Sequence, residues 1–494
     1  MNNKVIELPI IIGGEVYYPS NERENIEIEY ANGVKVIIPK ANKSDIEKIK
    51  NINKYMLHDM HFQEIINFLR KVGKFWDLSN ASDPLYVEAM NNLSAINGYD
   101  LKMSQRELNI INVMCSFGDT LHDMLDAELG SKFYLEEWLP VADALVHAEP
   151  KGNVLNIMVG NVPISSVMSL VRSIITKNKT IAKLPKRDPI TALYFALSFL
   201  KIDPNNPVSK SISIIYWQRE DETEKSLIDI SDVVVIWGGG AAVESIRSKT
   251  KSGTDIIEFG PKTSFAVIDK DASKSSKVAI DLAHDISIYN QEACFSTQMA
   301  FVEGNSDILI NNLKHGLEKY SKLLPKGEAT FDVHAHVTRT RLEELYKCNI
   351  VVQSRENTDW TIIKINDPSE IKEHPLSRVI YVIELEKFED FMKYVNENTQ
   401  TITISPWSRN TEIRDRATLL GASKITEIGL AEWQRIGMPH DNVYPLSRLV
   451  RWVGVERGLD YLGKNIEDGP VDTTLWLMMN ENLLENIGEG KYIQ

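Results

Sequence analysis

Cysteine and positive charge are both scarce in this sequence, and each shortage excludes a class of protein. Three cysteines, Cys115, Cys294 and Cys348, occur in 494 residues. They are too few for a disulfide framework, which favours a reducing compartment such as the cytoplasm. Lys and Arg number 55 against 69 Asp and Glu, a net charge of −14. This acidic excess argues against nucleic acid or an anionic membrane as a partner.

Long hydrophobic runs and repeats are also missing. The most apolar long window, 156–175, contains Asn161, Pro163 and Arg172, so no membrane span is expected. The apolar stretch near the N-terminus is too short and too interrupted for a signal peptide. The composition, 43% hydrophobic and 25% charged, is typical of a soluble globular protein of roughly two to four domains.

The first eighty residues carry turn and helix signals. Gly13-Gly14 and Asn32-Gly33 predict hairpin turns. From 44 to 76, apolar residues recur at helical spacing, which predicts a helix with one face in the core.

Strand and helix patterns alternate from residue 154 onward. The predicted strands are 154–159, 179–184, 211–216, 232–237, 264–268, 297–302, 378–385 and 401–404. The predicted helices are 165–176, 191–200, 241–248, 275–289 and 388–396. This order predicts right-handed βαβ units and parallel sheets in two α/β domains. The boundary between them is expected near Gly260-Pro261.

Two segments could bind phosphate. Gly238-Gly239-Gly240 closes a strand and opens a helix, where backbone N–H groups favour an anion, although a plain tight turn would use the same glycines. Lys183, Lys186 and Arg187 follow another strand. They indicate a phosphate site at the carboxyl ends of the strands, or else a solvated surface loop.

Cys294 precedes a strand and is a candidate nucleophile, although a lone cysteine is more often a small buried hydrophobic residue. Cys115 and Cys348 lie in helical-looking stretches and are assigned that structural role. Glu258 is a candidate general base or a solvated glutamate. His334 and His336 could share one side of a strand, but no nearby carboxylate or cysteine completes a ligand set, so no metal is expected.

Taken in order, six segments resemble the aldehyde dehydrogenase superfamily. They are Glu149-Pro150-Lys151-Gly152, Gly160-Asn161-Val162-Pro163, Lys183-Leu184-Pro185-Lys186, the Gly238 turn, Glu258-Phe259-Gly260-Pro261-Lys262 and Asn290-Gln291-Glu292-Ala293-Cys294. The resemblance implies an α/β fold of two doubly wound domains with a small oligomerisation element. It places an NADP-binding domain at 1–130 and 151–260, a catalytic domain at 261–440, and segments that bridge subunits at 131–150 and 441–494.

The same resemblance implies the roles of the site residues. Cys294 would be the nucleophile, and Asn161 would stabilise the oxyanion together with the Cys294 N–H. Glu258 would hold the general-base position. Lys183, Lys186, Gly238 and Gly239 would contact the cofactor.

A closer resemblance, over nearly the whole chain, is to the fatty-acyl reductase subunit of bacterial bioluminescence. It rests on residues 160–166, 373–378, 437–441 and 445–452. It implies reduction of long-chain acyl thioesters to the aldehyde used by luciferase, in a homo-oligomer that works with an acyl-protein synthetase and an acyltransferase. The alternatives are a shorter-chain CoA-acylating aldehyde dehydrogenase, a non-redox cysteine acyltransferase or thioesterase, and a catalytically silent assembly subunit.

Two departures from the superfamily pattern affect the cofactor. Lys186 stands where NAD-using relatives carry a glutamate for the ribose hydroxyls, and an ammonium would attract a 2′-phosphate, so NADPH is expected. The segment Glu373-His374-Pro375-Leu376-Ser377-Arg378 replaces the usual nicotinamide-ribose motif. The residue that holds this ribose is therefore left open.

Overall fold

The computed structural model describes residues 4–142, 144–219, 221–433 and 435–456. Contacts divide the chain into two compact units. The larger comprises 1–132 and 150–451, and the smaller comprises 133–149 with the residues from 452 onward. Within the expected bridging segment 441–494, residues 457–494 lie outside the described residues. The domain limits given above stay predictions.

A seven-stranded sheet forms the centre of the first α/β region, in the strand order β12-β11-β8-β9-β10-β2-β3. Strands β8 to β12 are parallel, which confirms the predicted βαβ units. Strands β2 and β3 extend the sheet in antiparallel fashion. The bounds are β2 Ile10–Ile12, β3 Glu15–Tyr17, β8 Asn153–Ile157, β9 Lys179–Lys183, β10 Ile212–Ile215, β11 Val233–Trp237 and β12 Asp255–Phe259.

Both predicted hairpin turns are present. Gly13 and Gly14 join β2 to β3 with φ values of 57° and 81°, a conformation that glycine adopts without strain. Asn32-Gly33 joins β4 to β5 in a three-stranded sheet of order β1-β5-β4. The bounds are β1 Val5–Glu7, β4 Asn25–Glu29 and β5 Lys35–Pro39.

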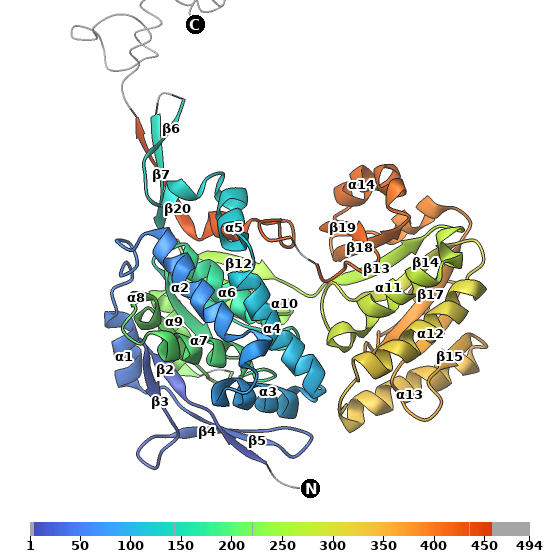
Figure 1. Ribbon diagram of the computed structural model, residues 1–494, viewed down its shortest axis with the longest axis horizontal. Coiled ribbons are helices and arrows are strands. Elements are labelled where there is room, and N and C mark those ends of the chain that lie inside the picture. The colour runs from blue at the N-terminus through green and yellow to red at the C-terminus, as the bar shows by residue number, and fades with distance from the viewer. Residues whose placement is uncertain (1–3, 143, 220, 434, 457–494) are drawn as a thin grey trace, which may run out of the picture. The chain divides into compact units, whose positions relative to one another are not determined.

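Helices cover the first sheet, and α2, α4, α6 and α7 pack against one another (Figure 1). The single helix expected over 44–76 is wrong. Asn42 caps α1 and His61 caps α2, so the chain turns between the two helices. The bounds are α1 Lys43–Asn51, α2 Phe62–Phe75, α3 Pro84–Asn97, α4 Leu101–Ser116, α5 Thr120–Leu129, α6 Pro163–Ile175, α7 Thr191–Ile202, α8 Pro207–Lys210, α9 Glu222–Ile230 and α10 Gly240–Lys249.

The second α/β region contains another seven-stranded sheet, in the order β15-β16-β17-β14-β13-β18-β19. All its strands are parallel except the edge strand β15. The strand bounds are β13 Thr263–Ile268, β14 Thr297–Glu303, β15 Ile350–Gln353, β16 Thr361–Ile365, β17 Val379–Leu385, β18 Thr399–Ser405 and β19 Lys424–Glu427.

Both faces of this second sheet are buried. Phe265 and Val267 of β13 pack in one core with residues of α13 and α14, whereas Ala266 and Ile268 pack in another with residues of α11 and α12. This alternation makes the region doubly wound, as expected. The helices are α11 Ser276–Ser287, α12 Asp307–Leu323, α13 Phe331–Tyr346 and α14 Asn410–Leu419.

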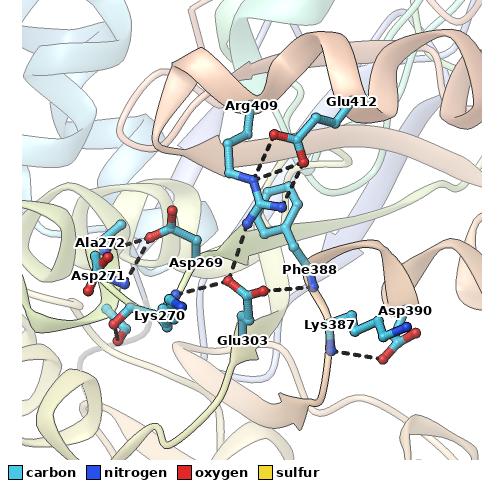
Figure 2. A network of polar contacts seen from close by, with 11 residues as sticks. Asp269, Lys270, Asp271, Ala272, Glu303, Lys387, Phe388, Asp390, Arg409 and Glu412 are labelled. Atoms are coloured by element: carbon cyan, nitrogen blue, oxygen red, sulfur yellow. Dashed lines mark hydrogen bonds and ion pairs between the residues drawn. The ribbon is translucent and has the colours of Figure 1, made fainter.

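The helix expected over 388–396 is instead a 3₁₀ helix, η6 (Phe388–Tyr394). A polar network fixes its start (Figure 2). Glu303, at the end of β14, accepts from the Phe388 N–H at 3.3 Å and pairs with Arg409 at 3.2 Å. The Arg409 guanidinium lies 3.9 Å from the centre of the Phe388 ring. These contacts tie η6 to the carboxyl end of the sheet.

The smaller unit contains a three-stranded sheet in the order β20-β7-β6. The bounds are β6 Leu139–Val141, β7 Ala144–Pro150 and β20 Val450–Glu456, and a short helix, α15 (Pro445–Arg448), precedes β20 in the chain. Among the described residues, no helix is both long and apolar enough to cross a membrane.

Candidate active site

Cys294 lies in the loop between the 3₁₀ turn η4 (Ile288–Gln291) and strand β14. Three residues of this loop are left-handed, with φ of 51° at Tyr289, 50° at Asn290 and 69° at Gln291. Side chains with a Cβ adopt this region only where their surroundings fix them. Gln291 provides part of that fixation, because it donates to the carbonyls of Thr297 at 2.7 Å and Val379 at 2.6 Å.

A second left-handed stretch braces the first. Leu376, Ser377 and Arg378 have φ values of 52°, 60° and 63°. The Ser377 N–H donates to the Asn290 carbonyl at 3.0 Å, and the Arg378 Nε donates to the Asn290 Oδ1, also at 3.0 Å. The segment that replaces the usual ribose motif therefore holds the loop that carries Cys294.

The Cys294 thiol contacts a side chain at the start of β18, which is separated from β14 by β13 in the same sheet. Gln400, on β18, donates from Nε2 to the Cys294 Sγ at 2.9 Å and to the Asp441 Oδ1 at 2.9 Å. Burial, followed by the charge of Asp441, raises the pKa of Cys294 to about 12, and the Gln400 N–H acts in the opposite direction. This shift favours the thiol form of Cys294 over the thiolate.

Cys294 borders a cavity of about 1220 Å³ that residues of both seven-stranded sheet regions line. Asn161, Gly238 and Gly239 line the same cavity, so the structure brings these three predicted site residues together with Cys294. Much of the remaining wall is apolar and comes from α4, α6 and the residue after α4. The wall residues of this group are Ile110, Val113, Met114, Phe117, Ile164 and Met168.

Asn161 lies between β8 and α6, at the carboxyl end of the first sheet. Its Nδ2 donates to the carbonyl of Glu292 at 2.8 Å, two residues before Cys294. The Tyr99 hydroxyl donates to the Asn161 carbonyl at 3.2 Å. A primary amide has two N–H donors, so one remains for an oxygen bound in the cavity.

Glu258 is in a different environment. It lies on β12, its carboxylate pairs with Arg247 of α10, and it is not among the described residues that line the cavity. The structure therefore does not bring Glu258 to Cys294. Its general-base role stays a prediction.

Lys183 and Lys186 line a second cavity of about 380 Å³, at the carboxyl ends of β9 and β10. Trp217 and Arg219 line it too, and the Lys183 ammonium lies 5.8 Å from the centre of the Trp217 ring. Burial lowers the pKa of Lys183. Arg187, the third cation of this run, instead pairs with Glu292 in the loop that carries Cys294.

Several smaller predictions concern residues outside the two cavities. Cys115 is buried in α4 as expected, but Cys348 is exposed and lies after the end of α13, so its assignment as a buried residue is wrong. His334 and His336 lie on helix α13, not on a strand. Within the described ranges, no cluster of three or more His, Cys, Asp or Glu could hold a metal ion.

Residues 57–452 match the model of the acyl-CoA reductase (LuxC) family. The chain belongs to this family. It is 35% identical over 468 residues to the long-chain acyl-protein thioester reductase of Photobacterium phosphoreum, covering 93% of each chain. It is 36% identical over 464 residues to the protein of that name from Vibrio harveyi, covering 93% of this chain and 95% of the relative.

Solved structures confirm the aldehyde dehydrogenase fold of this acyl-CoA reductase family member. Succinate-semialdehyde dehydrogenase from Burkholderia pseudomallei matches with a TM-score of 0.72 at 15% identity, covering 92% of this chain and 98% of that one. Aldehyde dehydrogenase 21 from Physcomitrella patens matches with a TM-score of 0.67 at 15% identity, covering 92% and 98%.

Sequence reasoning missed three residues of these cavities: Gln400, Asp441 and Arg219. Asp441 lies within a segment that carried the resemblance, yet nothing in its spacing indicated contact with Gln400. Arg219 follows the strand after the Lys183 strand. Because parallel strands end at one sheet edge, that position could have indicated a shared site.

Proposed function

We propose that this acyl-CoA reductase family member reduces a long-chain fatty acyl thioester to the aldehyde used by bacterial luciferase, through an acyl-cysteine at Cys294. Membership of the family and the names of the relatives make it an oxidoreductase that acts on acyl groups. One structural observation supports the assignment of the site. The Cys294 thiol borders a large cavity with an apolar wall from α4 and α6, suited to an acyl chain.

Acylation forms one bond and breaks another. The Cys294 sulfur attacks the acyl carbonyl, its S–C bond forms, and the bond to the donor thiol breaks. The donor leaves as a thiol that carries the proton lost by Cys294. Asn161 and the Cys294 N–H donate to the carbonyl oxygen as negative charge develops on it.

The second cavity supports a nicotinamide cofactor with a 2′-phosphate, NADPH. Lys186 and Arg219 supply two cations that make no ion pair with another described residue. Two carboxylates line the same cavity, Glu27, which pairs with Lys35, and Glu29. Gly238 and Gly239 leave the start of α10 open, because a Cβ at Gly239 would meet no atom within 4 Å. When bound, the reduced cofactor supplies the hydride that converts the acyl group into an aldehyde. Cys294 then leaves the substrate carbon and regains a proton.

The resemblance alone implies a general-base role for Glu258, and the geometry of the site argues against it. Its pairing with Arg247 holds the carboxylate away from the cavity, so we expect Glu258→Gln to change the rate of acylation by no more than about threefold. A loss of tenfold or more, with normal folding, would restore the role that the resemblance implies.

The proposal extends to partners and compartment. The donor is an acyl-protein synthetase that works with an acyltransferase in a fatty acid reductase complex, as the bioluminescence resemblance implies. Large apolar side chains on the β20-β7-β6 sheet, and Trp138 just before β6, support a homo-oligomer. Trp138, Val141, Leu145, Trp452 and Val455 are each more than 40% exposed. A cytoplasmic location fits a mechanism that needs Cys294 as a reduced thiol.

The decisive experiment is the intact mass of the enzyme after incubation with tetradecanoyl-CoA, and again after NADPH is added. We expect one acyl adduct that is absent in Cys294→Ala and present in Cys348→Ala. NADPH should remove the adduct as tetradecanal appears. An adduct that NADPH leaves in place would make the protein an acyltransferase. The same yield of adduct in Cys294→Ala would refute the nucleophile.

A further inference from the structure

The carboxamide of Gln400 contacts two partners with one nitrogen. Gln400 is 6% exposed, and its Nε2 lies 2.9 Å from the Cys294 Sγ and 2.9 Å from the Asp441 Oδ1. Its Oε1 is buried and has no hydrogen-bond partner among the described residues. Both N–H groups are therefore used, whereas the carbonyl end of the amide is not.

This arrangement depends on which way the amide is turned. A neutral thiol accepts a hydrogen bond from an N–H and donates one to a carbonyl oxygen, so Cys294 alone would tolerate either orientation. Burial raises the pKa of Asp441, and the Gln400 N–H opposes that shift. In its ionised form the carboxylate only accepts, so the contact at 2.9 Å requires the NH₂ group. Asp441 therefore selects the orientation in which the other N–H points at the sulfur.

We propose that Gln400 is a catalytic residue that donates a hydrogen bond to the Cys294 thiolate, and that Asp441 is the positioning residue that holds the carboxamide in the donating orientation. This inference rests on Cys294 being the nucleophile of the proposed function. The sulfur carries negative charge twice, as the thiolate before it attacks the acyl carbonyl and again when it leaves the reduced substrate. The same N–H stabilises the sulfur at both steps.

Other charged groups surround the pair and must be held constant in any test. Lys424 of β19 interacts electrostatically with Cys294. Lys262, just before β13, and Arg172 of α6 both act to lower the pKa of Asp441. His440 lines the same cavity with a pKa lowered by burial to about 3, so it is neutral at working pH. The variants below leave these four residues in place.

The test is the rate at which iodoacetamide alkylates Cys294, measured by peptide mass between pH 7 and 10, because only the thiolate reacts. Exposed Cys348 in the same sample serves as the internal reference. We expect Gln400→Met, which preserves volume but removes the donor, to slow alkylation of Cys294 about tenfold at each pH. Gln400→Glu, a near-isosteric variant with an added negative charge, should slow it at least as much.

Asn398→Ala removes an exposed carboxamide next to the start of the same strand and should leave the rate unchanged. An unchanged rate in Gln400→Met would overturn the donor role. Thermal unfolding of every variant shows whether a change in rate reflects a change in folding.

The role of Asp441 requires a double-mutant cycle, because Asp441→Asn also removes a charge that raises the pKa of the thiol. If Asp441 orients the amide, Gln400→Met should slow alkylation by less than about threefold in the Asp441→Asn background. An undiminished tenfold effect would reject the positioning role. Acylation of the wild-type enzyme is measured separately, by the intact mass described above. If it is absent while these alkylation results hold, the proposed function fails, and Gln400 keeps its hydrogen bond to the Cys294 thiolate but loses its catalytic role.

Discussion

The Asn161 carboxamide has one N–H engaged by the Glu292 carbonyl at 2.8 Å and a second one available. The engaged hydrogen fixes the direction of the other, so the donor is oriented before substrate arrives. Oriented donors of this kind stabilise charge that develops on an acyl oxygen. We therefore expect Asn161 to hold the Cys294 loop with one N–H and to donate to the acyl oxygen with the other.

Asn161→Ala should lower kcat for acyl reduction by about 10²- to 10³-fold while the protein stays folded. Steady-state rates with tetradecanoyl-CoA and NADPH measure the loss, and Asn398→Ala provides a carboxamide control on the surface. A rate within about twofold of the wild type would remove Asn161 from the mechanism.

Glu107 of α4 is fully buried beside Arg106, whose guanidinium lies 3.2 Å away. Burial dominates and raises the pKa of Glu107 to about 8. The folded protein therefore keeps a proton that the unfolded chain releases above about pH 4.5. Because the unfolded state binds fewer protons between pH 4.5 and 8, the contribution of Glu107 to stability falls as the pH rises through that window.

Glu107→Gln mimics the protonated acid and removes this dependence. We expect the free energy of unfolding of the variant, relative to the wild type, to rise steadily from pH 5 to pH 8. Urea unfolding at four pH values measures the difference. Glu356→Gln, an exposed substitution, is the control and should show no such trend. A difference that does not vary with pH would mean that Glu107 is ionised in the fold.

At the scale of elements, the buried parallel strands were predictable because each is a short apolar run bounded by turn residues. The end of α1 at Asn51 and the His61 cap of α2 were not recognised within the long helical pattern of 44–76. The 3₁₀ form of η6 was not predicted, because the Phe388 N–H at its start is bound by Glu303, which is distant in sequence. Cys294 and Asn161 could be identified from a series of motifs that occur in a fixed order along the chain. Gln400 is 106 residues beyond Cys294, and only the pairing of the strands in the sheet shows that the two are in contact.

The carboxyl ends of β9 and β10 together form the second cavity, and that placement predicts cofactor selectivity. Lys186→Glu should lower kcat/KM with NADPH by about 10- to 100-fold, because an attraction for the 2′-phosphate becomes a repulsion. The loss with NADH should be much smaller. Lys210→Glu makes the same charge change at the opposite end of β10 and should leave the ratio of the two cofactors unchanged. Equal losses with both cofactors would argue against a 2′-phosphate site.

At the scale of the whole molecule, the exposed apolar residues of the β20-β7-β6 sheet predict self-association. Val455→Glu should lower the molar mass measured by light scattering toward that of a monomer, because a buried unpaired charge opposes assembly. Val5→Glu is a matched control, since Val5 is 53% exposed on β1 and Val455 is 52% exposed on β20. If both variants kept the wild-type mass, this sheet would not be the interface.

The two left-handed segments, 289–291 and 376–378, also bear on the order in which the site is assembled during translation. Asn290 and Arg378 are 88 residues apart, so a ribosome that has just translated Cys294 has yet to make the segment that braces its loop. Gln400 and Asp441 are translated later still. A nascent chain therefore carries the proposed nucleophile before it has the residues that shape its surroundings. We expect a product truncated at this point to form no stable acyl adduct.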